Sequence, residues 1–151
     1  MNKLNVCIAS SSGGHLKQAL RLLPAFEENN IFFITERKCN GLDLAKHNKV
    51  YFITPARRKI HRLIISFLQS LRIFLIERPS VIVSTGAEIG FPPMVLGLLF
   101  FRKVIYIETF ARTDDLSLTG KLLYPFVKNF YVQWEPLRKK YPRAKYAGAL
   151  Y

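Results

Sequence analysis

Acidic residues are scarce in this sequence. It has 10 Asp and Glu against 23 Lys and Arg, which leaves a formal net charge of +13 over 151 residues. A positive field of this size attracts nucleic acid, anionic lipid headgroups or an acidic protein. Composition alone does not choose among these partners, and a basic protein without an anionic partner is a fourth interpretation.

Cysteine is also rare. Cys7 lies in an apolar run and Cys39 in an expected loop, and their spacing fits neither a metal site nor a redox motif. A disulfide framework is therefore not expected, and a reducing cytosolic compartment is the default. No cluster of His, Cys, Asp and Glu has the spacing of metal ligands, so no metal is expected either.

Long apolar segments are missing as well. No segment reaches the ~18 uninterrupted apolar residues of a membrane-spanning helix, and the first apolar run, Leu4–Ala9, is shorter than the ~7–15 residues of a signal-peptide core. We therefore expect no signal peptide and no clear transmembrane helix. Half of the residues are nevertheless hydrophobic, which excludes disorder and predicts a single domain, residues 1–151, with a substantial core.

Apolar runs of strand character alternate with helical periodicity along nearly the whole chain. Expected strands cover residues 4–9, 31–35, 50–53, 80–84, 103–107, 130–132 and 145–147, and expected helices cover residues 16–23, 42–45, 57–77, 94–101, 120–124 and 136–141. Pro92 and Pro93 are expected in the first turn of their helix. The alternation predicts an α/β fold: a Rossmann-like, mainly parallel sheet with helices on both faces and ligands at the carboxyl ends of its strands.

A loop of small residues, Ser10–His15, separates the first expected strand from the first helix. Its glycines let the backbone approach a ligand, and free N–H groups at a helix start suit a phosphate. The loop lacks the third glycine of the dinucleotide fingerprint, which argues against NAD. A purely structural turn stays open, but His15 stands beside the expected phosphate, where an imidazole can act as a general base or donate to the phosphate.

A second loop of small residues, Thr85-Gly86-Ala87-Glu88, follows the fourth expected strand and lies at the same sheet edge. A structural turn and a substrate contact are both open interpretations for it. Glu108 ends the next strand, and we expect it to bind or orient a hydroxyl group.

The segment from Arg57 to Arg78 combines six positive charges and one carboxylate with many large apolar residues. Cations at a helix start oppose the helix dipole, so helix stability does not explain them. Basic groups beside an apolar face favour a helix lying on an anionic membrane surface. Isolated aromatics make no stacking platform for nucleic acid, and a core helix with solvated basic residues is the alternative. The expected membrane-surface residues are Arg57, Arg58, Lys59, Arg62, Phe67 and Phe74.

Three motifs in order resemble one protein family. They are Ser11–Leu16, then Val83–Ala87 with Pro92-Pro93, then Tyr106–Arg112, and a shorter match follows near Gln133-Trp134-Glu135 and Gly148. The family is the membrane-anchoring, acceptor-binding subunit of split GT-B glycosyltransferases. It includes the subunit that partners the catalytic chain in the second step of dolichol-linked oligosaccharide assembly, and bacterial relatives in capsular and exopolysaccharide synthesis. The first loop is also similar to that of the peptidoglycan lipid-II-forming transferase.

The resemblance implies the N-terminal half of a GT-B enzyme, whose UDP-sugar donor is held mainly by a separate catalytic subunit in a heterodimer. This chain would bind no cofactor itself. It would hold a polyprenyl-pyrophosphate-linked sugar acceptor, with His15 as the base and Glu108 in the catalytic site. The acceptor- or phosphate-binding residues would be Ser11, Ser12, Gly13, Gly14, Thr85, Gly86 and Glu88.

Eukaryotic members of the family carry an N-terminal membrane helix, whereas Met1-Asn2-Lys3 leads straight into a strand here. Membrane attachment is then expected to be peripheral, at the cytoplasmic face of the inner or plasma membrane, through the segment from Arg57 to Arg78 or through the partner. No nucleic acid is expected. A non-catalytic scaffold that recruits the active subunit, and a basic nucleic-acid-binding α/β domain, are the alternative functions.

Overall fold

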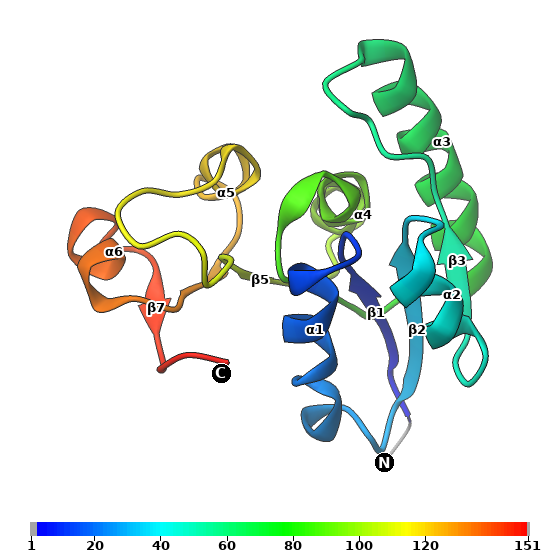
Figure 1. The fold of residues 1–151 in the computed structure, drawn as a ribbon, viewed down its shortest axis with the longest axis horizontal. Coiled ribbons are helices and arrows are strands. Elements are labelled where there is room, and N and C mark those ends of the chain that lie inside the picture. Colours follow the sequence, from blue (N-terminus) through cyan, green and yellow to red (C-terminus); the bar gives the residue numbers. More distant parts are fainter. Residues whose placement is uncertain (1–2, 151) are drawn as a thin grey trace.

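The computed structural model describes residues 3–150, which form one seven-stranded sheet with helices on both faces (Figure 1). The strand order is β3-β2-β1-β4-β5-β6-β7, and every pair of neighbours is parallel. The strands are β1 (Asn5–Ala9), β2 (Asn30–Thr35), β3 (Val50–Phe52), β4 (Val81–Ser84), β5 (Lys103–Ile107), β6 (Asn129–Val132) and β7 (Lys145–Tyr146). The predicted α/β class and parallel sheet are confirmed.

The direction of winding reverses between β1 and β4. From β1 the chain proceeds outward through β2 to β3, and from β4 it proceeds to the opposite edge at β7. Loops that leave β1 and β4 therefore diverge to opposite sides of the sheet, and ligands of doubly wound sheets bind at such a point, off the carboxyl ends of the strands.

Helices cover the two faces unequally. One face carries α1 (Gly14–Leu20), a 3-10 turn (Leu23–Ala25) and α2 (Cys39–Ala45), and the other carries α3 (Ile60–Glu77), α4 (Ala87–Leu99), α5 (Leu118–Leu123) and α6 (Glu135–Lys140). Side chains alternate between these faces along each strand. In β1, Val6 and Ile8 pack toward the α1 face, whereas Cys7 and Ala9 pack toward the α4 face. Cys39 begins α2 and does not lie in a loop as expected.

The long basic helix begins three residues later than predicted. Arg57 and Arg58 have φ values of 46° and 60°, in the left-handed region, so the helix starts only at Ile60. Of the four basic residues expected in its first turns, only Arg62 lies within α3. The helix ends at a further left-handed residue, Arg78, a common form of helix termination.

The apolar helix after β4 begins earlier than predicted. It starts at Ala87, so Pro92 and Pro93 lie in its interior and not in its first turn. Each proline lacks the N–H that would bond to the carbonyl four residues before it, which costs about 3 kcal/mol in an exposed helix. Packing offsets this cost, because Ile89, Met94 and Leu96 are buried between the sheet and α3. Burial of a long apolar segment is a tertiary effect that local proline rules do not include.

Candidate functional site

The Ser10–His15 loop connects β1 to α1 at the carboxyl edge of the sheet. Gly13 has a φ of 86°, which an L side chain rarely adopts, and α1 starts at the next residue. A Cβ atom built at Gly13 or Gly14 would meet no other atom within 4 Å. Packing within the chain therefore does not demand both glycines, and the open space beside them is free for an approaching ligand.

Two reciprocal hydrogen bonds join this loop to the Thr85–Glu88 loop. His15 Nδ1 lies 2.9 Å from the Thr85 carbonyl oxygen, and Thr85 Oγ1 donates to the His15 carbonyl at 2.8 Å. A carbonyl only accepts, so Nδ1 carries a proton and Nε2 of the neutral ring keeps its lone pair. A Cβ atom at Gly86, whose φ is 101°, would lie 3.5 Å from the His15 ring. The structure thus brings together the two loops singled out in the sequence, with His15 held in the form that can accept a proton at Nε2.

Thr85 itself is fully buried, and Ser11 is 9% exposed. With its hydroxyl bonded to His15, Thr85 supports the loop rather than presenting its side chain to a ligand. Ser12, Gly13, Gly14 and His15 are the parts of the first loop with exposed surface.

Glu36, which follows β2, supports the first loop from the other side. Its Oε1 accepts a hydrogen bond from Ser12 Oγ at 2.8 Å and lies 3.0 Å from Lys38 Nζ. Burial by itself would raise the pKa of Glu36, but the hydrogen bonds from Lys38 and Ser12 outweigh it and hold the pKa below the usual value. A supporting role for Glu36 was not predicted from the sequence. The feature that pointed to it was its position directly after an expected strand, at the same sheet edge as the first loop.

Glu108 is completely buried at the end of β5. One carboxylate oxygen accepts from the Thr109 N–H at 2.9 Å, and the other accepts from the N–H and the hydroxyl of Ser117, each at 3.0 Å. Burial raises the pKa of this carboxyl group, whereas these hydrogen bonds oppose the rise. The geometry makes Glu108 a residue that orients the 109–117 loop. Its expected contact with an acceptor hydroxyl stays a prediction.

A chain of amide groups ties that loop to α1. Gln133 Nε2 donates to Gln18 Oε1 at 2.7 Å and to the Glu108 carbonyl at 2.9 Å. The indole N–H of Trp134 donates to the Phe110 carbonyl at 2.7 Å, and the two rings pack with centroids 4.7 Å apart. The loops after β1, β5 and β6 are therefore fixed relative to one another. Gln18 was not singled out in the sequence, because a glutamine within a helix carries no motif, and Gln133 appeared there only in the short match near Gln133-Trp134-Glu135.

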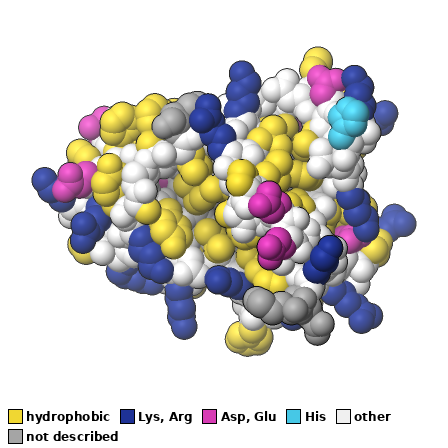
Figure 2. All heavy atoms as spheres, turned by 90° about the horizontal axis from the view of Figure 1, so that it is seen from below, with side chains coloured by type: hydrophobic (Ala, Val, Ile, Leu, Met, Phe, Trp, Pro, Cys, Tyr) yellow, Lys and Arg dark blue, Asp and Glu magenta, His cyan; other side chains and the backbone are white. Residues whose placement is uncertain are grey.

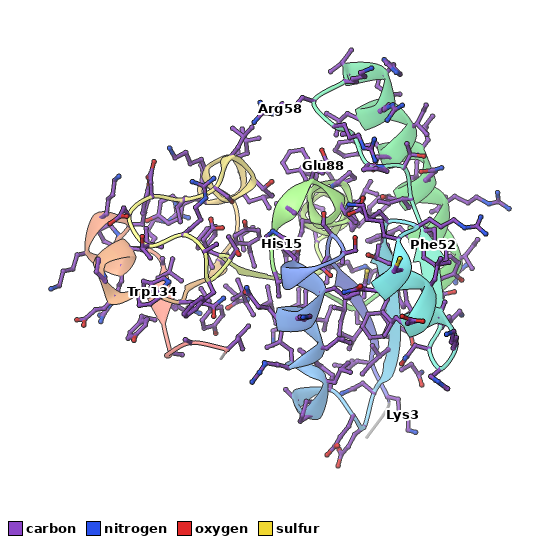
Figure 3. The ribbon with its side chains drawn as sticks, viewed as in Figure 1. Lys3, His15, Phe52, Arg58, Glu88 and Trp134 are labelled. Atoms are coloured by element: carbon purple, nitrogen blue, oxygen red, sulfur yellow. The ribbon has the colours of Figure 1, made fainter. Side chains whose placement is uncertain are left out.

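Glu88 lies in the first turn of α4, where the helix dipole favours a negative charge. Its Oε2 accepts a hydrogen bond from the Arg57 N–H at 2.7 Å, so it anchors the turn before α3. Figure 3 shows Arg58 and Glu88 in the upper part of the molecule and His15 below them near its middle, whereas Lys3 lies at the bottom. The face at the bottom also carries basic side chains around its rim and few acidic ones (Figure 2).

The apolar residues expected at a membrane surface need one correction. Phe74 is 6% exposed in the core and stacks on Phe100 at the C-terminal end of α4, and Phe67 is half-buried edge-to-face against Phe91. Helical periodicity cannot by itself tell the core stripe of an all-round apolar helix from its outer stripe. The large apolar side chains that α3 does expose are Ile60, Ile64, Ile65, Leu68, Leu75 and Ile76. Within residues 3–150, no helix combines the length and apolarity needed to cross a membrane.

Comparison with known proteins adds a family and a fold. A family model described as "Oligosaccharide biosynthesis protein Alg14 like" matches residues 35–150. UDP-N-acetylglucosamine transferase subunit ALG14 of Rattus norvegicus is 29% identical over 97% of this chain and 83% of its own length. The same-named protein of Eremothecium gossypii is 45% identical over 48% of this chain and 35% of its own length. The first loop lies before residue 35, where the family match begins. The alignment with the rat protein covers 97% of this chain and therefore includes the loop.

Two solved structures share the fold at low sequence identity. MurG from Acinetobacter baumannii superposes with a TM-score of 0.71 at 12% identity, over 89% of this chain and 43% of that one. UDP-N-acetylglucosamine 2-epimerase from Rickettsia bellii superposes with a TM-score of 0.78 at 9% identity, over 99% of this chain and 46% of that one. The chain thus spans less than half the length of the solved structures it matches, and it has the fold of one part of them.

Proposed function

The chain belongs to the Alg14 family, and on that basis we propose that it is the acceptor-binding subunit of a two-chain, UDP-sugar-dependent glycosyltransferase. Its substrate would be a saccharide on a polyprenyl-pyrophosphate carrier, in the synthesis of a capsular or extracellular polysaccharide. The observation that carries this proposal is the pair of hydrogen bonds between His15 and Thr85. These bonds join the loops after β1 and β4, at the point where the sheet reverses its winding.

The chemistry follows from the free lone pair on His15 Nε2. An acceptor hydroxyl placed against Nε2 gives up its proton as its oxygen attacks the anomeric carbon of the donor sugar, and UDP leaves from the opposite face. Such in-line displacement inverts the anomeric configuration and needs a base on the acceptor side. The Thr85 carbonyl steadies the resulting imidazolium, because Nδ1–H remains hydrogen-bonded to it.

The donor would be held by a separate catalytic subunit. The described residues match less than half of each superposed chain, and ligands of this fold bind at the carboxyl edge, which the first loop leaves open. A second domain supplied by a partner chain would close over that edge and bring UDP-sugar to His15. No group in this chain would bind a cofactor of its own.

Reconstitution with a donor-binding chain tests the proposal. Co-expression with a donor-binding glycosyltransferase chain from the same organism should yield a stable heterodimer that transfers sugar from a UDP-sugar to a polyprenyl-diphosphate-linked acceptor. Neither chain alone should show transfer above about 1% of the pair, because the donor and the base lie on different polypeptides. Full transfer by this chain alone, or failure to associate with any such partner, would contradict the split-enzyme proposal.

The exposed apolar stripe of α3 supports peripheral attachment to an anionic bilayer. Ile64 and Leu68 are 56% and 62% exposed and lie one helical turn apart, and Arg62 and Arg72 accompany them on the same helix. Ile64→Ser/Leu68→Ser should lower partition onto vesicles rich in phosphatidylglycerol by about 10²- to 10⁴-fold, since inserting each of the two side chains contributes about 1.5–3 kcal/mol. Leu42→Ser, which removes a 43% exposed leucine from α2 on the other face, should change partition little. Equal losses in both variants would argue against α3 as the contact.

The competing function is a non-catalytic scaffold that recruits the active subunit. The observation that favours it is the large apolar surface on α3. A scaffold would tolerate the loss of His15, whereas an acceptor-binding subunit would not.

A further inference from the structure

A strained turn of two arginines stands beside the candidate site. Lys59 N–H donates to the Ala56 carbonyl at 2.9 Å, and the two residues between them, Arg57 and Arg58, both have left-handed φ values. This is the pattern of a type I′ turn, whose central positions are normally occupied by Asn and Gly. Each L residue other than Gly, Asn or Asp is disfavoured there. Backbone preference therefore does not explain why arginines occupy the two positions, and the explanation must come from their guanidinium groups.

The turn is held rigidly at the sheet's carboxyl edge. The Arg57 N–H donates to Glu88 Oε2 at 2.7 Å, and Ala56 is 7% exposed beneath the turn. Because Glu88 belongs to the first turn of α4, the arginine turn is fixed to the helix that follows Thr85 and Gly86. A rigid support lowers the entropy that a guanidinium loses when it binds an anion.

Arg57 also lines an open cleft of about 320 Å³ between the ends of β2 and β3. Arg37 and Lys38 approach this cleft from β2, and Thr54 and Pro55 from β3. The cleft's carboxylate is Glu36, which is already bonded to Ser12 of the first loop and to Lys38. Across residues 3–150, no carboxylate lies within ion-pair distance of Arg37, Arg57 or Arg58. Of the three cations that line the cleft, Lys38 is paired with Glu36, which leaves Arg37 and Arg57 without a carboxylate partner among the described residues. Glu36 connects the cleft to the first loop.

We propose that this cleft, with the Arg57-Arg58 turn as its rim, binds the diphosphate group of the lipid-linked acceptor. Forked guanidinium groups match the oxygens of a diphosphate and hold it by charge-assisted hydrogen bonds. Glu36 of the cleft is bonded to Ser12 of the first loop, and Arg57 of the cleft lies three residues before α3 begins. A diphosphate bound there would therefore direct its lipid tail toward α3 and its sugar toward the first loop and His15. The proposal rests on the proposed function for the identity of the ligand. It assigns Arg57 and Arg58, expected from sequence to meet the bilayer, to the substrate.

The turn permits a test in which binding and stability change in opposite directions. Arg57→Asn/Arg58→Gly places residues that prefer left-handed backbone at both positions, so the Tm should rise by about 2–8 °C. The affinity for inorganic pyrophosphate, measured by ¹⁵N NMR titration of the isolated chain, should fall at least about 10-fold, because charged hydrogen bonds are lost. Arg78→Gly is the matched control. It removes one positive charge and the strain of one left-handed arginine at the far end of α3, and should leave pyrophosphate affinity unchanged.

Binding to vesicles distinguishes the two possible sources of phosphate, the diphosphate of the lipid-linked acceptor and the headgroups of the bilayer. The double variant should lose binding to neutral vesicles that contain polyprenyl diphosphate and keep binding to phosphatidylglycerol vesicles without it. Loss confined to phosphatidylglycerol vesicles would place bilayer headgroups at the turn and overturn the proposal, as would an unchanged pyrophosphate affinity or an equal loss in Arg78→Gly. None of these measurements uses sugar transfer, so failure of the enzyme assignment and failure of the diphosphate site would be distinguished.

Discussion

Replacing His15 by alanine is expected to slow sugar transfer by the reconstituted two-chain enzyme by about 10²- to 10⁴-fold, the usual contribution of a positioned general base. The loss should appear in kcat more than in KM, because the imidazole acts on the proton that moves in the transition state. His47→Ala is the matched control. This exposed histidine follows α2, away from the loops after β1 and β4, and its removal should leave kcat unchanged.

The tautomer of His15 offers a readout that does not depend on the partner. The Thr85 carbonyl accepts from Nδ1, so ¹⁵N NMR of the isolated chain at a pH where the ring is neutral should show the proton on Nδ1 and none on Nε2. Free imidazole side chains favour the opposite tautomer, which makes the result specific to the pairing. An unchanged kcat in His15→Ala would show that His15 is not the catalytic base. A proton found on Nε2 would show that this nitrogen has no free lone pair, which the proposed mechanism requires.

Replacing Glu108 by alanine should lower the free energy of unfolding by about 3–5 kcal/mol in urea titrations. Two backbone N–H groups and the Ser117 hydroxyl would lose their acceptor, each at about 1–3 kcal/mol, and a cavity would remain. Glu108→Gln keeps the shape and one acceptor, and should cost about 1–3 kcal/mol. Glu28→Ala, an exposed acid in a loop, is the control and should change stability by less than about 0.5 kcal/mol.

The difference in unfolding free energy between wild type and Glu108→Gln should decrease as the pH rises. Because burial raises the pKa of Glu108 in the folded state, the folded protein binds the proton more tightly than the unfolded chain, whose value is about 4.3. The stability that this group contributes is therefore complete below about pH 4.3 and is lost as the pH rises through the folded pKa. The gap between wild type and Glu108→Gln should narrow over that range. A gap that widens as the pH rises would mean that the hydrogen bonds outweigh burial.

The position of every strand could be predicted from the sequence, because buried parallel strands are short apolar runs that helix-forming segments separate. β5 has its predicted bounds, and each of the other strands differs from its predicted range by one residue at one end. The two glycine-containing loops were recognisable for the same reason, since each interrupts a strand–helix boundary with residues that permit unusual backbone angles. That both loops lie at the same edge of the sheet followed from the expected parallel strands, whose carboxyl ends all meet at one edge.

Three features depended on contacts between distant residues. The start of α3 was misplaced because Glu88, 31 residues along the chain, holds the Arg57 turn. Phe74 was assigned to the outer surface because its stacking on Phe100 is a contact between two helices. The hydrogen bonds of Glu36 and Gln133 could not be predicted from the sequence, since their partners lie 24 and 115 residues away along the chain.

By itself, the sequence determined the α/β class, the alternation of strands and helices, the two loops and the family resemblance, because each depends on residues close together in the chain. Only the tertiary structure decided that His15 is bonded to Thr85, that Glu108 faces inward, and that Arg57 joins a cationic cleft beside the first loop. These outcomes are set by which side chains meet when β1, β2 and β4 are brought into register, a relation among residues up to 75 positions apart.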